Sequence, residues 1–246
     1  MITLNNVTKT YARGGVRAVD NLDLHVRRGE IFGFLGPNGA GKSTTIKMMT
    51  GILQPTEGTV FIDGVNLAES PEECKAKIGY VPDQHEMFER LSGFEYLNFI
   101  GDVYGVSALD RAARMNKYLD MFELGDAAGS LIRSYSRGMK QKLLLVGALL
   151  HNPPLWILDE PMVGLDPKSA LRLKEQMRAH CDAGNTVFFS THVLEVAERL
   201  CDRIGIINGG RLAAVGTMDE LRSGKGDETL EKLFFELTEK DGGEEL

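Results

Sequence analysis

The sequence predicts an α/β fold with a mostly parallel sheet, preceded by an antiparallel sheet at the N-terminus. Two wholly apolar runs, residues 31–35 and 155–158, are too short for helices and are typical of strands buried on both faces. Helical patterns follow both runs, and this alternation builds parallel sheets. Residues 1–30 instead alternate apolar and polar side chains, which predicts short antiparallel strands.

Composition and charge are those of an ordinary globular protein. The chain has 246 residues, of which 43% are hydrophobic and 26% charged, enough for one large core or two modest ones. Its longest apolar run, residues 143–150, is far shorter than the roughly 20 residues needed to cross a bilayer. The formal net charge is −7, so no overall basic field and no nucleic-acid partner are expected, which leaves room only for a local basic groove. The three cysteines lack metal or redox spacing.

Residues 36–43 fit the phosphate-loop pattern G-x-x-x-x-G-K-[ST] at every position. Glycines allow consecutive backbone amides to curl around a phosphate chain. Lys42 would bring a positive charge to the terminal phosphates, and the Ser43 hydroxyl is a ligand for Mg²⁺. The helix that begins near Gly41 would point the positive end of its dipole at the same anion. A nucleoside triphosphate is therefore predicted to bind at Gly36, Pro37, Asn38, Gly39, Ala40, Gly41, Lys42, Ser43 and Thr44.

The stretch after the phosphate-loop helix changes from strands to helices. Residues 59–62 and 78–81 are predicted strands, and Pro82 ends the second. From there the pattern is helical, with capping boxes that begin at Ser92 and Ser107.

The α/β alternation then resumes. Asp166 and Pro167 are the N-cap and first residue of a predicted helix that ends near Gly184. A strand, a helix and a hairpin are predicted after it, at residues 186–190, 193–201 and 204–215.

These patterns divide the chain into three predicted parts. An α/β core comprises residues 1–83 and 154–216, and a helical lobe of residues 84–153 is inserted within it. The last part, residues 217–246, is an acidic tail. It carries one amphipathic helix, with an apolar face made by Leu230, Leu233, Phe234 and Leu237.

Three chemically active side chains follow predicted parallel strands. Asp159 and Glu160 end the run 155–158, and His192 comes after the strand 186–190. Because the carboxyl ends of such strands open onto one crevice, all three are expected beside the phosphate loop. Asp159 would ligate Mg²⁺, and Glu160 would polarise the attacking water. His192 lies where a contact to the γ-phosphate is expected, although a single histidine is more often a capping or core residue.

At this point the chain resembles the nucleotide-binding subunit of an ATP-binding-cassette transporter, over about residues 1–216. The segment GPNGAGKST resembles the family's phosphate loop, LWILDEP its acidic strand, GLDP the loop that follows, and STH its switch histidine. Tyr11 alone would be a strand aromatic packed on a neighbour, but the resemblance implies that its ring stacks on adenine.

Residues 134–141, SYSRGMKQ, occupy the position of the family signature, usually LSGGQ. Ser136 and Gly138 match it, and the resemblance implies that both bind nucleotide; the residues around them differ. Ser136 can cap the next helix, whose amides would face phosphate, but that helix needs a cap in either case. The form YSxGMxQ is similar to that of bacterial cassettes that drive small export permeases.

A second departure from the family follows Pro82. The resemblance implies a glutamine there that contacts the metal and the attacking water and couples the site to the permease. Asp83 stands in that position and Gln84 comes one place later, so either residue is a candidate.

The resemblance implies an ATPase that uses ATP and Mg²⁺ and works as a head-to-tail homodimer or heterodimer. It would power a separate transmembrane permease, an exporter, from the cytoplasmic face of the cell membrane. The main alternative is a cassette ATPase that does mechanical work in DNA repair, translation or cluster assembly. The chain has one cassette and no long coiled-coil insertion, which argues against it. The signature segment argues against a plain phosphate-loop kinase.

Overall fold

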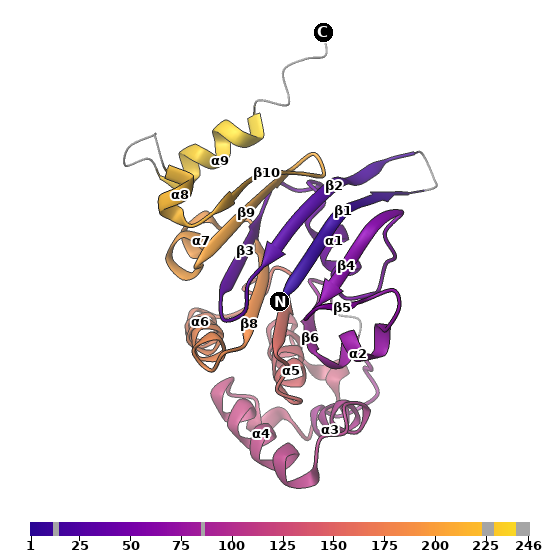
Figure 1. Cartoon of the computed structure of the whole chain (residues 1–246). Helices are drawn as coiled ribbons and strands as arrows, with labels where there is room; N and C mark the ends of the chain where they lie inside the picture. Colours follow the sequence, from indigo (N-terminus) through magenta and orange to yellow (C-terminus); the bar gives the residue numbers. More distant parts are fainter. Residues whose placement is uncertain (12–14, 85–86, 223–228, 240–246) are drawn as a thin grey trace.

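The computed structural model describes residues 1–11, 15–84, 87–222 and 229–239 (Figure 1). The strands are β1 (Ile2–Thr10), β2 (Arg17–Val26), β3 (Ile31–Leu35), β4 (Glu57–Ile62), β5 (Val65–Asn66), β6 (Ile78–Val81), β7 (Leu155–Leu158), β8 (Thr186–Thr191), β9 (Arg203–Asn208) and β10 (Arg211–Gly216). The helices are α1 (Lys42–Met49), α2 (Pro71–Ala76), α3 (Gly93–Val103), α4 (Ala108–Met121), α5 (Arg137–Leu149), α6 (Pro167–Asp182), α7 (Leu194–Leu200), α8 (Met218–Arg222) and α9 (Leu230–Glu239). Short 3₁₀ turns lie at Gly125–Ala127 and Ile132–Ser134.

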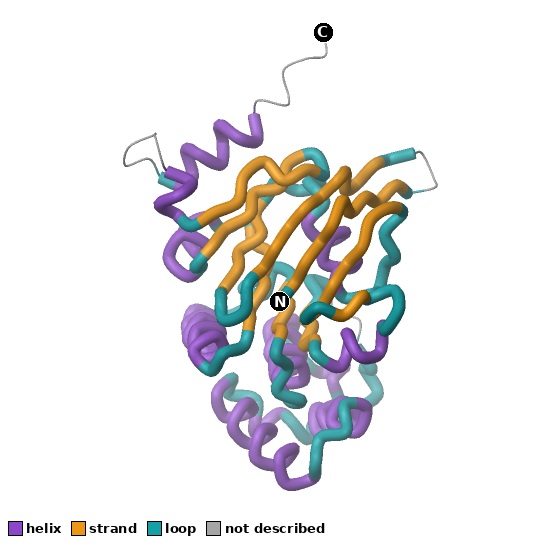
Figure 2. The backbone as a smooth tube through the Cα atoms, in the orientation of Figure 1, coloured by secondary structure: helices purple, strands orange, loops and turns teal. Residues whose placement is uncertain are grey.

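The strands form two sheets, which confirms the predicted fold class (Figure 2). A six-stranded sheet has the order β10-β9-β3-β8-β7-β6 and is parallel from β9 to β6. The hairpin predicted at residues 204–215 adds β10 as its one antiparallel strand. A separate four-stranded sheet, in the order β2-β1-β4-β5, is antiparallel.

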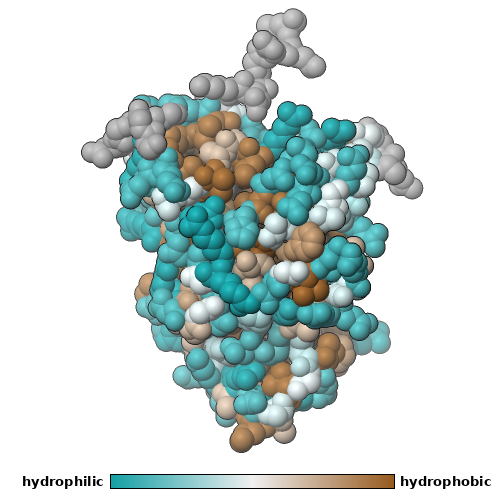
Figure 3. All heavy atoms as spheres, viewed as in Figure 1, coloured by the Kyte–Doolittle hydropathy of each residue, from teal (hydrophilic) through white to brown (hydrophobic). Residues whose placement is uncertain are grey.

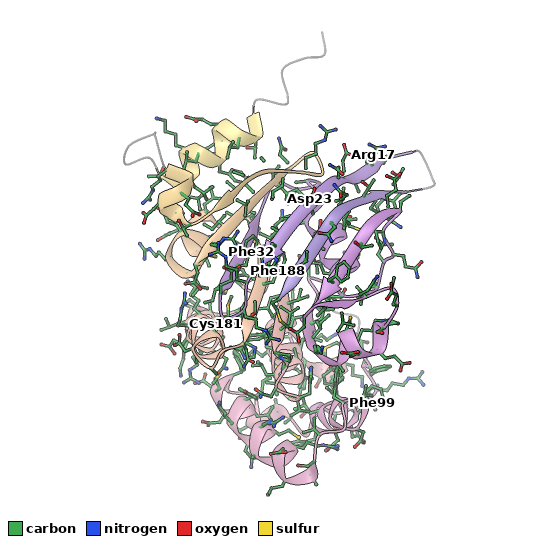
Figure 4. The ribbon with its side chains drawn as sticks, viewed as in Figure 1. Arg17, Asp23, Phe32, Phe99, Cys181 and Phe188 are labelled. Carbon is green, nitrogen blue, oxygen red and sulfur yellow. The ribbon has the colours of Figure 1, made fainter. Side chains whose placement is uncertain are left out.

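The apolar runs are explained by cores on both faces of the six-stranded sheet. Phe32 of β3 and Phe188 of β8 pack toward the antiparallel sheet and α1, with their rings stacked 5.6 Å apart (Figure 4). Their neighbours Ile31, Val187 and Phe189 pack on the opposite face, with residues of α5 and α6. Successive residues therefore enter different cores, and a wholly apolar run replaces the usual alternation.

The helices predicted after Pro82 are α3, α4 and α5, at the end of the molecule away from the antiparallel sheet (Figure 1). Ser92 caps α3 through both bonds of a capping box with Glu95, and Ser107 caps α4. One apolar cluster joins these helices to Val81, Trp156 and Leu158 of the sheet. The helices and the sheet therefore share a core, and the division at residues 84 and 153 stays a prediction.

The last described helix, α9, packs on the edge of the six-stranded sheet. Leu230 and Leu233 are buried in α9, and Leu230 belongs to a cluster with Leu35, Ile204 and Ile206. The acidic residues after Glu239 lie outside the described residues.

The outer surface is largely hydrophilic in the view of Figure 3. Val103 and Leu109, at the turn between α3 and α4, are among the most exposed large apolar residues. Within the described ranges, no helix is both long and apolar enough to span a bilayer.

We expect Phe188→Ala to lower the free energy of unfolding by about 3–5 kcal/mol. The substitution leaves a cavity between the sheets and removes the ring contacts of Phe188 to Phe32 and Phe34. Urea titration followed by circular dichroism measures the change. Leu109→Ala is the control, because Leu109 is 83% exposed and its loss should change stability by less than about 0.5 kcal/mol. Equal stability of the two variants would contradict the assigned core.

Candidate functional site

The phosphate loop connects β3 to α1 and is shaped by glycines. Gly41 has a φ of 107°, and a Cβ atom there would lie 2.5 Å from the carbonyl oxygen of Ala18. A Cβ atom on Gly36 would lie 2.4 Å from the carbonyl oxygen of Ile207. Larger residues would push the loop away from the hairpin and from β2. The glycine positions of the sequence pattern are therefore also packing requirements of this fold.

Lys42 is buried inside the loop. Its Nζ donates hydrogen bonds to the carbonyl oxygens of Gly36, at 2.6 Å, and Pro37, at 3.2 Å. Burial lowers the pKa of Lys42, while the nearby carboxylates of Glu160 and Asp159 act in the opposite direction. The ammonium group is thus held close to both carboxylates of the acidic strand.

Two adjoining cavities bring the predicted phosphate and metal residues together. The first has a volume of about 220 Å³ and is lined by Ala18, Pro37, Asn38, Gly39, Gly41, Lys42, Ser43, Thr44, Asp83 and Glu160. The second, of about 360 Å³, is lined by Ser43, Lys47, Ile52, Tyr80, Pro82, Asp83, Gln84 and Asp159. Ser43 and Asp83 line both cavities, so the phosphate loop, the end of β6 and the acidic strand share one depression.

The acidic strand ends in an unusual backbone conformation. Asp159 is 2% exposed, and its Oδ1 accepts a hydrogen bond of 2.6 Å from the Ser190 hydroxyl. Glu160 has a φ of 49°, in the left-handed region that residues other than glycine seldom adopt. Its backbone N–H donates to the same hydroxyl at 3.0 Å. This pair of bonds was not predicted, because it depends on the register of β7 with β8.

His192 and Glu160 are in direct contact. His192 Nδ1 lies 3.0 Å from Glu160 Oε2, and the histidine side chain is 59% exposed while that of Glu160 is 15% exposed. The sequence predicts both residues in one crevice but not this contact. A carboxylate and an imidazole at hydrogen-bond distance can orient each other and share a proton.

Tyr80, on β6, is a residue of the site that the sequence analysis missed. It lines the cavity that also contains Ser43 and Asp159. Burial raises the pKa of Tyr80, and the negative charges of Asp159 and Asp83 raise it further. Its place two residues before Pro82, on the strand beside the acidic strand, is the signal that could have identified it.

Asp83 and Gln84 differ in the cavities that they line. Both line the 360 Å³ cavity and a third one of about 480 Å³ that extends to Tyr135, Arg137 and Lys140. Asp83 also lines the smaller phosphate-loop cavity, together with Glu160.

Tyr11 lies at the end of β1, beside the phosphate-loop helix. Its hydroxyl is 3.4 Å from Thr44 Oγ1, and 40% of the residue is exposed. An accessible ring at this edge leaves a face on which a planar base can stack.

The signature segment is attached to the loop after the acidic strand. Ser136 caps α5 by accepting the Met139 amide, and a Cβ atom on Gly138 would lie 2.6 Å from the Gly164 carbonyl oxygen. Gln141 Nε2 donates to the Pro161 carbonyl at 2.9 Å. Neither Ser136 nor Gly138 is among the described residues that line the two phosphate-loop cavities.

An ion pair adds to this attachment. Lys142 Nζ lies 2.8 Å from Asp166 Oδ2, and Asp166 also caps α6 through the Ser169 amide. The bond with Lys142, followed by those with Ser169, holds the pKa of Asp166 well below its usual range.

Comparisons with known proteins agree with this geometry. Residues 19–163 match the family model described as ABC transporter. The chain is 38% identical to the daunorubicin/doxorubicin resistance ATP-binding protein DrrA of Streptomyces peucetius, over 100% of this chain and 74% of that protein. It is 35% identical to the ABC-type transporter ATP-binding protein EcsA of Bacillus subtilis, over 100% and 99% of the two chains.

Two solved structures are similar throughout. One is the ATP-binding subunit of an ABC transporter, with a TM-score of 0.92, 36% identity and coverage of 96% of this chain and 99% of that one. The other is the dimeric ATP-binding cassette MJ0796 bound to ADP and Pi, with a TM-score of 0.80, 28% identity and coverage of 89% and 99%. The chain therefore belongs to the ABC transporter family, as an ATP-binding subunit that hydrolyses ATP.

Proposed function

We propose that this ATPase powers a separate membrane permease that exports its substrate, from the cytoplasmic face of the membrane. The observation that carries the ATPase chemistry is the depression in which Lys42, Asp159 and Glu160 meet the phosphate loop. The exporter direction is supported by relatives named for daunorubicin resistance, linearmycin resistance and Nod factor export. These names describe resistance and export, which disfavours the alternative of mechanical work in DNA repair, translation or cluster assembly.

The triphosphate of ATP would lie in the 220 Å³ cavity, against the amides of residues 36–44. Lys42 Nζ, now bonded to two carbonyl oxygens, is within reach of the terminal phosphates by a rotation of its flexible side chain. Tyr11 would stack on adenine at the edge of the loop.

The 360 Å³ cavity fits Mg²⁺. It gathers the Ser43 hydroxyl, the carboxylates of Asp159 and Asp83, and the amide of Gln84, which are the oxygen ligands that this cation prefers. In the described part of the chain, no three His, Cys, Asp or Glu side chains form a metal cluster. Phosphate oxygens and water would therefore complete the shell, as is usual for Mg²⁺ in ATPases. When bound, Mg²⁺ would neutralise charge on the β- and γ-phosphates.

Glu160 is the proposed general base. Its carboxylate lines the phosphate-loop cavity, where it can accept the proton of a water that attacks the γ-phosphorus while ADP leaves. His192 lies 3.0 Å from that carboxylate and would hold it toward the γ-phosphate. Both residues come from strand ends of one sheet, so little reorganisation is needed at the moment of reaction.

The distance of the signature from its own phosphate loop supports a dimer. Ser136 and Gly138 face neither phosphate-loop cavity among the described residues, yet the N-terminus of α5 is a suitable phosphate site. A two-fold axis would bring each signature onto the nucleotide of the opposite chain. The partner is a second copy or a related cassette, and the dimeric form of MJ0796 supports this arrangement.

Glu160→Gln should retain ATP binding while turnover falls by a factor on the order of 10² or more, because an amide cannot accept the proton of the attacking water. Lys42→Ala should weaken nucleotide binding itself. Phosphate release and binding of a fluorescent ATP analogue measure the two effects. Glu175→Gln makes the same chemical change on the exposed face of α6 and should leave both unchanged. Normal turnover in Glu160→Gln would remove Glu160 from the mechanism.

Alanine substitutions at Asp83 and Gln84 should separate two roles. Because Asp83 alone of the two lines the cavity with Lys42 and Glu160, Asp83→Ala should lower the basal ATPase rate several-fold. Gln84→Ala should mainly reduce the stimulation of that rate by the permease. The ATPase rate is measured with the subunit alone and with its permease in lipid vesicles. If neither variant changed either rate, the coupling assignment would be wrong.

Two inactive variants should complement each other if the signature acts across a dimer. Lys42→Ala disables the phosphate loop, and Ser136→Arg disables the signature. Their heterodimer contains one site with an intact Lys42 from one chain and an intact Ser136 from the other, so ATPase activity should return on mixing. Cross-linking verifies that heterodimers form. A heterodimer of wild type and Lys42→Ala is the control, because it shows whether one intact site can turn over alone. If that control is active and the mixture of the two variants stays inactive, action across the dimer is ruled out.

A further inference from the structure

Ser190 occupies a place in the fold from which it contacts both carboxylate residues of the acidic strand. It lies on β8 and is completely buried. Strand β8 pairs in parallel with β7, and Phe189 is opposite Leu158 in the register. The next residue of each strand is therefore also adjacent, which brings Ser190 beside Asp159.

The hydrogen bonds of Ser190 have only one possible direction. A serine hydroxyl has one proton to donate and two lone pairs that accept. The amide of Glu160 can only donate, so the hydroxyl accepts that bond, at 3.0 Å. The proton of the hydroxyl is then donated to Asp159 Oδ1, at 2.6 Å. A single buried group thus fixes a side chain at one residue and the backbone at the next.

The backbone at Glu160 needs such a constraint. Its φ of 49° is unfavourable for a residue with a Cβ atom, and such a conformation persists only when the surrounding structure enforces it. This conformation also aims the Glu160 side chain at His192, where Oε2 lies 3.0 Å from Nδ1. The bond from the Glu160 amide to Ser190 is one of the interactions that can enforce it.

We propose that Ser190 is a positioning residue that sets the separation and orientation of Asp159 and Glu160 relative to each other. This inference rests on the proposed function, in which Asp159 faces the metal and Glu160 faces the attacking water. Ser190 itself touches neither water nor nucleotide in this scheme. It acts on the metal through the Asp159 carboxylate and on the water through the Glu160 backbone.

If Ser190 had a purely structural role, its removal should have the same effect as the removal of another buried hydroxyl on the same strand. Thr186, at the opposite end of β8, is also completely buried and accepts the Gly29 amide at 3.1 Å. Thr186→Val removes a buried hydroxyl from the same strand without approaching the acidic pair. It is therefore the matched control for Ser190→Ala, and thermal unfolding of both variants verifies that each is folded.

Ser190→Ala should change two separate measurements. Turnover should fall by about tenfold to a hundredfold, the usual range for a residue that orients a metal ligand through a hydrogen bond. The Mg²⁺ concentration that supports half-maximal binding of a fluorescent ATP analogue should rise by about tenfold. Thr186→Val should change neither by more than about twofold. If Ser190→Ala does not fold, Ser190→Cys replaces it, because a thiol is a weak donor of similar shape.

A double-mutant cycle with Glu160→Gln separates the two routes of action. At saturating Mg²⁺ the route through Asp159 no longer limits turnover. When residue 160 can no longer accept a proton, its exact position should also matter little, so adding Ser190→Ala should then lower the residual turnover by less than about threefold. The shift in Mg²⁺ dependence should persist, because it acts through Asp159.

Two results would overturn the proposal. One is a Ser190→Ala variant that matches Thr186→Val in both turnover and Mg²⁺ dependence. The other is a double variant whose turnover loss at saturating Mg²⁺ equals the product of the losses of Ser190→Ala and Glu160→Gln. If instead Glu160→Gln alone retained normal turnover, the proposed role of Glu160 would fail, while the Mg²⁺ measurement would still test the contact of Ser190 with Asp159.

Discussion

The parallel pairing of β3 with β8, and of β8 with β7, is the constraint on which the rest of this structure depends. It sets Leu35 opposite Thr191 and Phe189 opposite Leu158, so three strands end at the same edge of the sheet. The phosphate loop, His192 and the acidic pair follow those ends directly. A slip of one residue between β7 and β8 would turn Asp159 toward the wrong core and separate it from Ser190.

The parts of the site that sequence could predict are those with local causes. The phosphate loop is defined by glycines that its own turn requires, and the caps at Ser92 and Ser107 depend on residues three places away. The antiparallel N-terminal sheet followed from simple alternation. The fold class and the phosphate-loop pattern can therefore be inferred from short stretches of the sequence alone.

The remaining features depend on which strands become neighbours and in which register. The contact of Glu160 with His192, and the two bonds of Ser190, join residues about 30 positions apart through β7 and β8. Tyr80 was missed for a similar reason, since its place two residues before Pro82 points to the cavity only once β6 is known to lie beside the acidic strand. Asp83 and Gln84 are adjacent polar residues that the sequence does not distinguish, whereas in the structure Asp83 alone of the two lines the cavity with Lys42 and Glu160.

The shared core of the helices and the sheet has a mechanical consequence. Helix α5 is 13 residues long, or about 20 Å, and most of it is buried in the apolar cluster that also contains Val81 and Leu158. Its second turn is bonded to the loop after the acidic strand through Gln141 and Lys142. Tightly packed interiors have low compressibility, so such a helix moves as a rigid body. A displacement of α3 and α4 would therefore be transmitted through α5 to the acidic strand, with little local deformation of α5 itself.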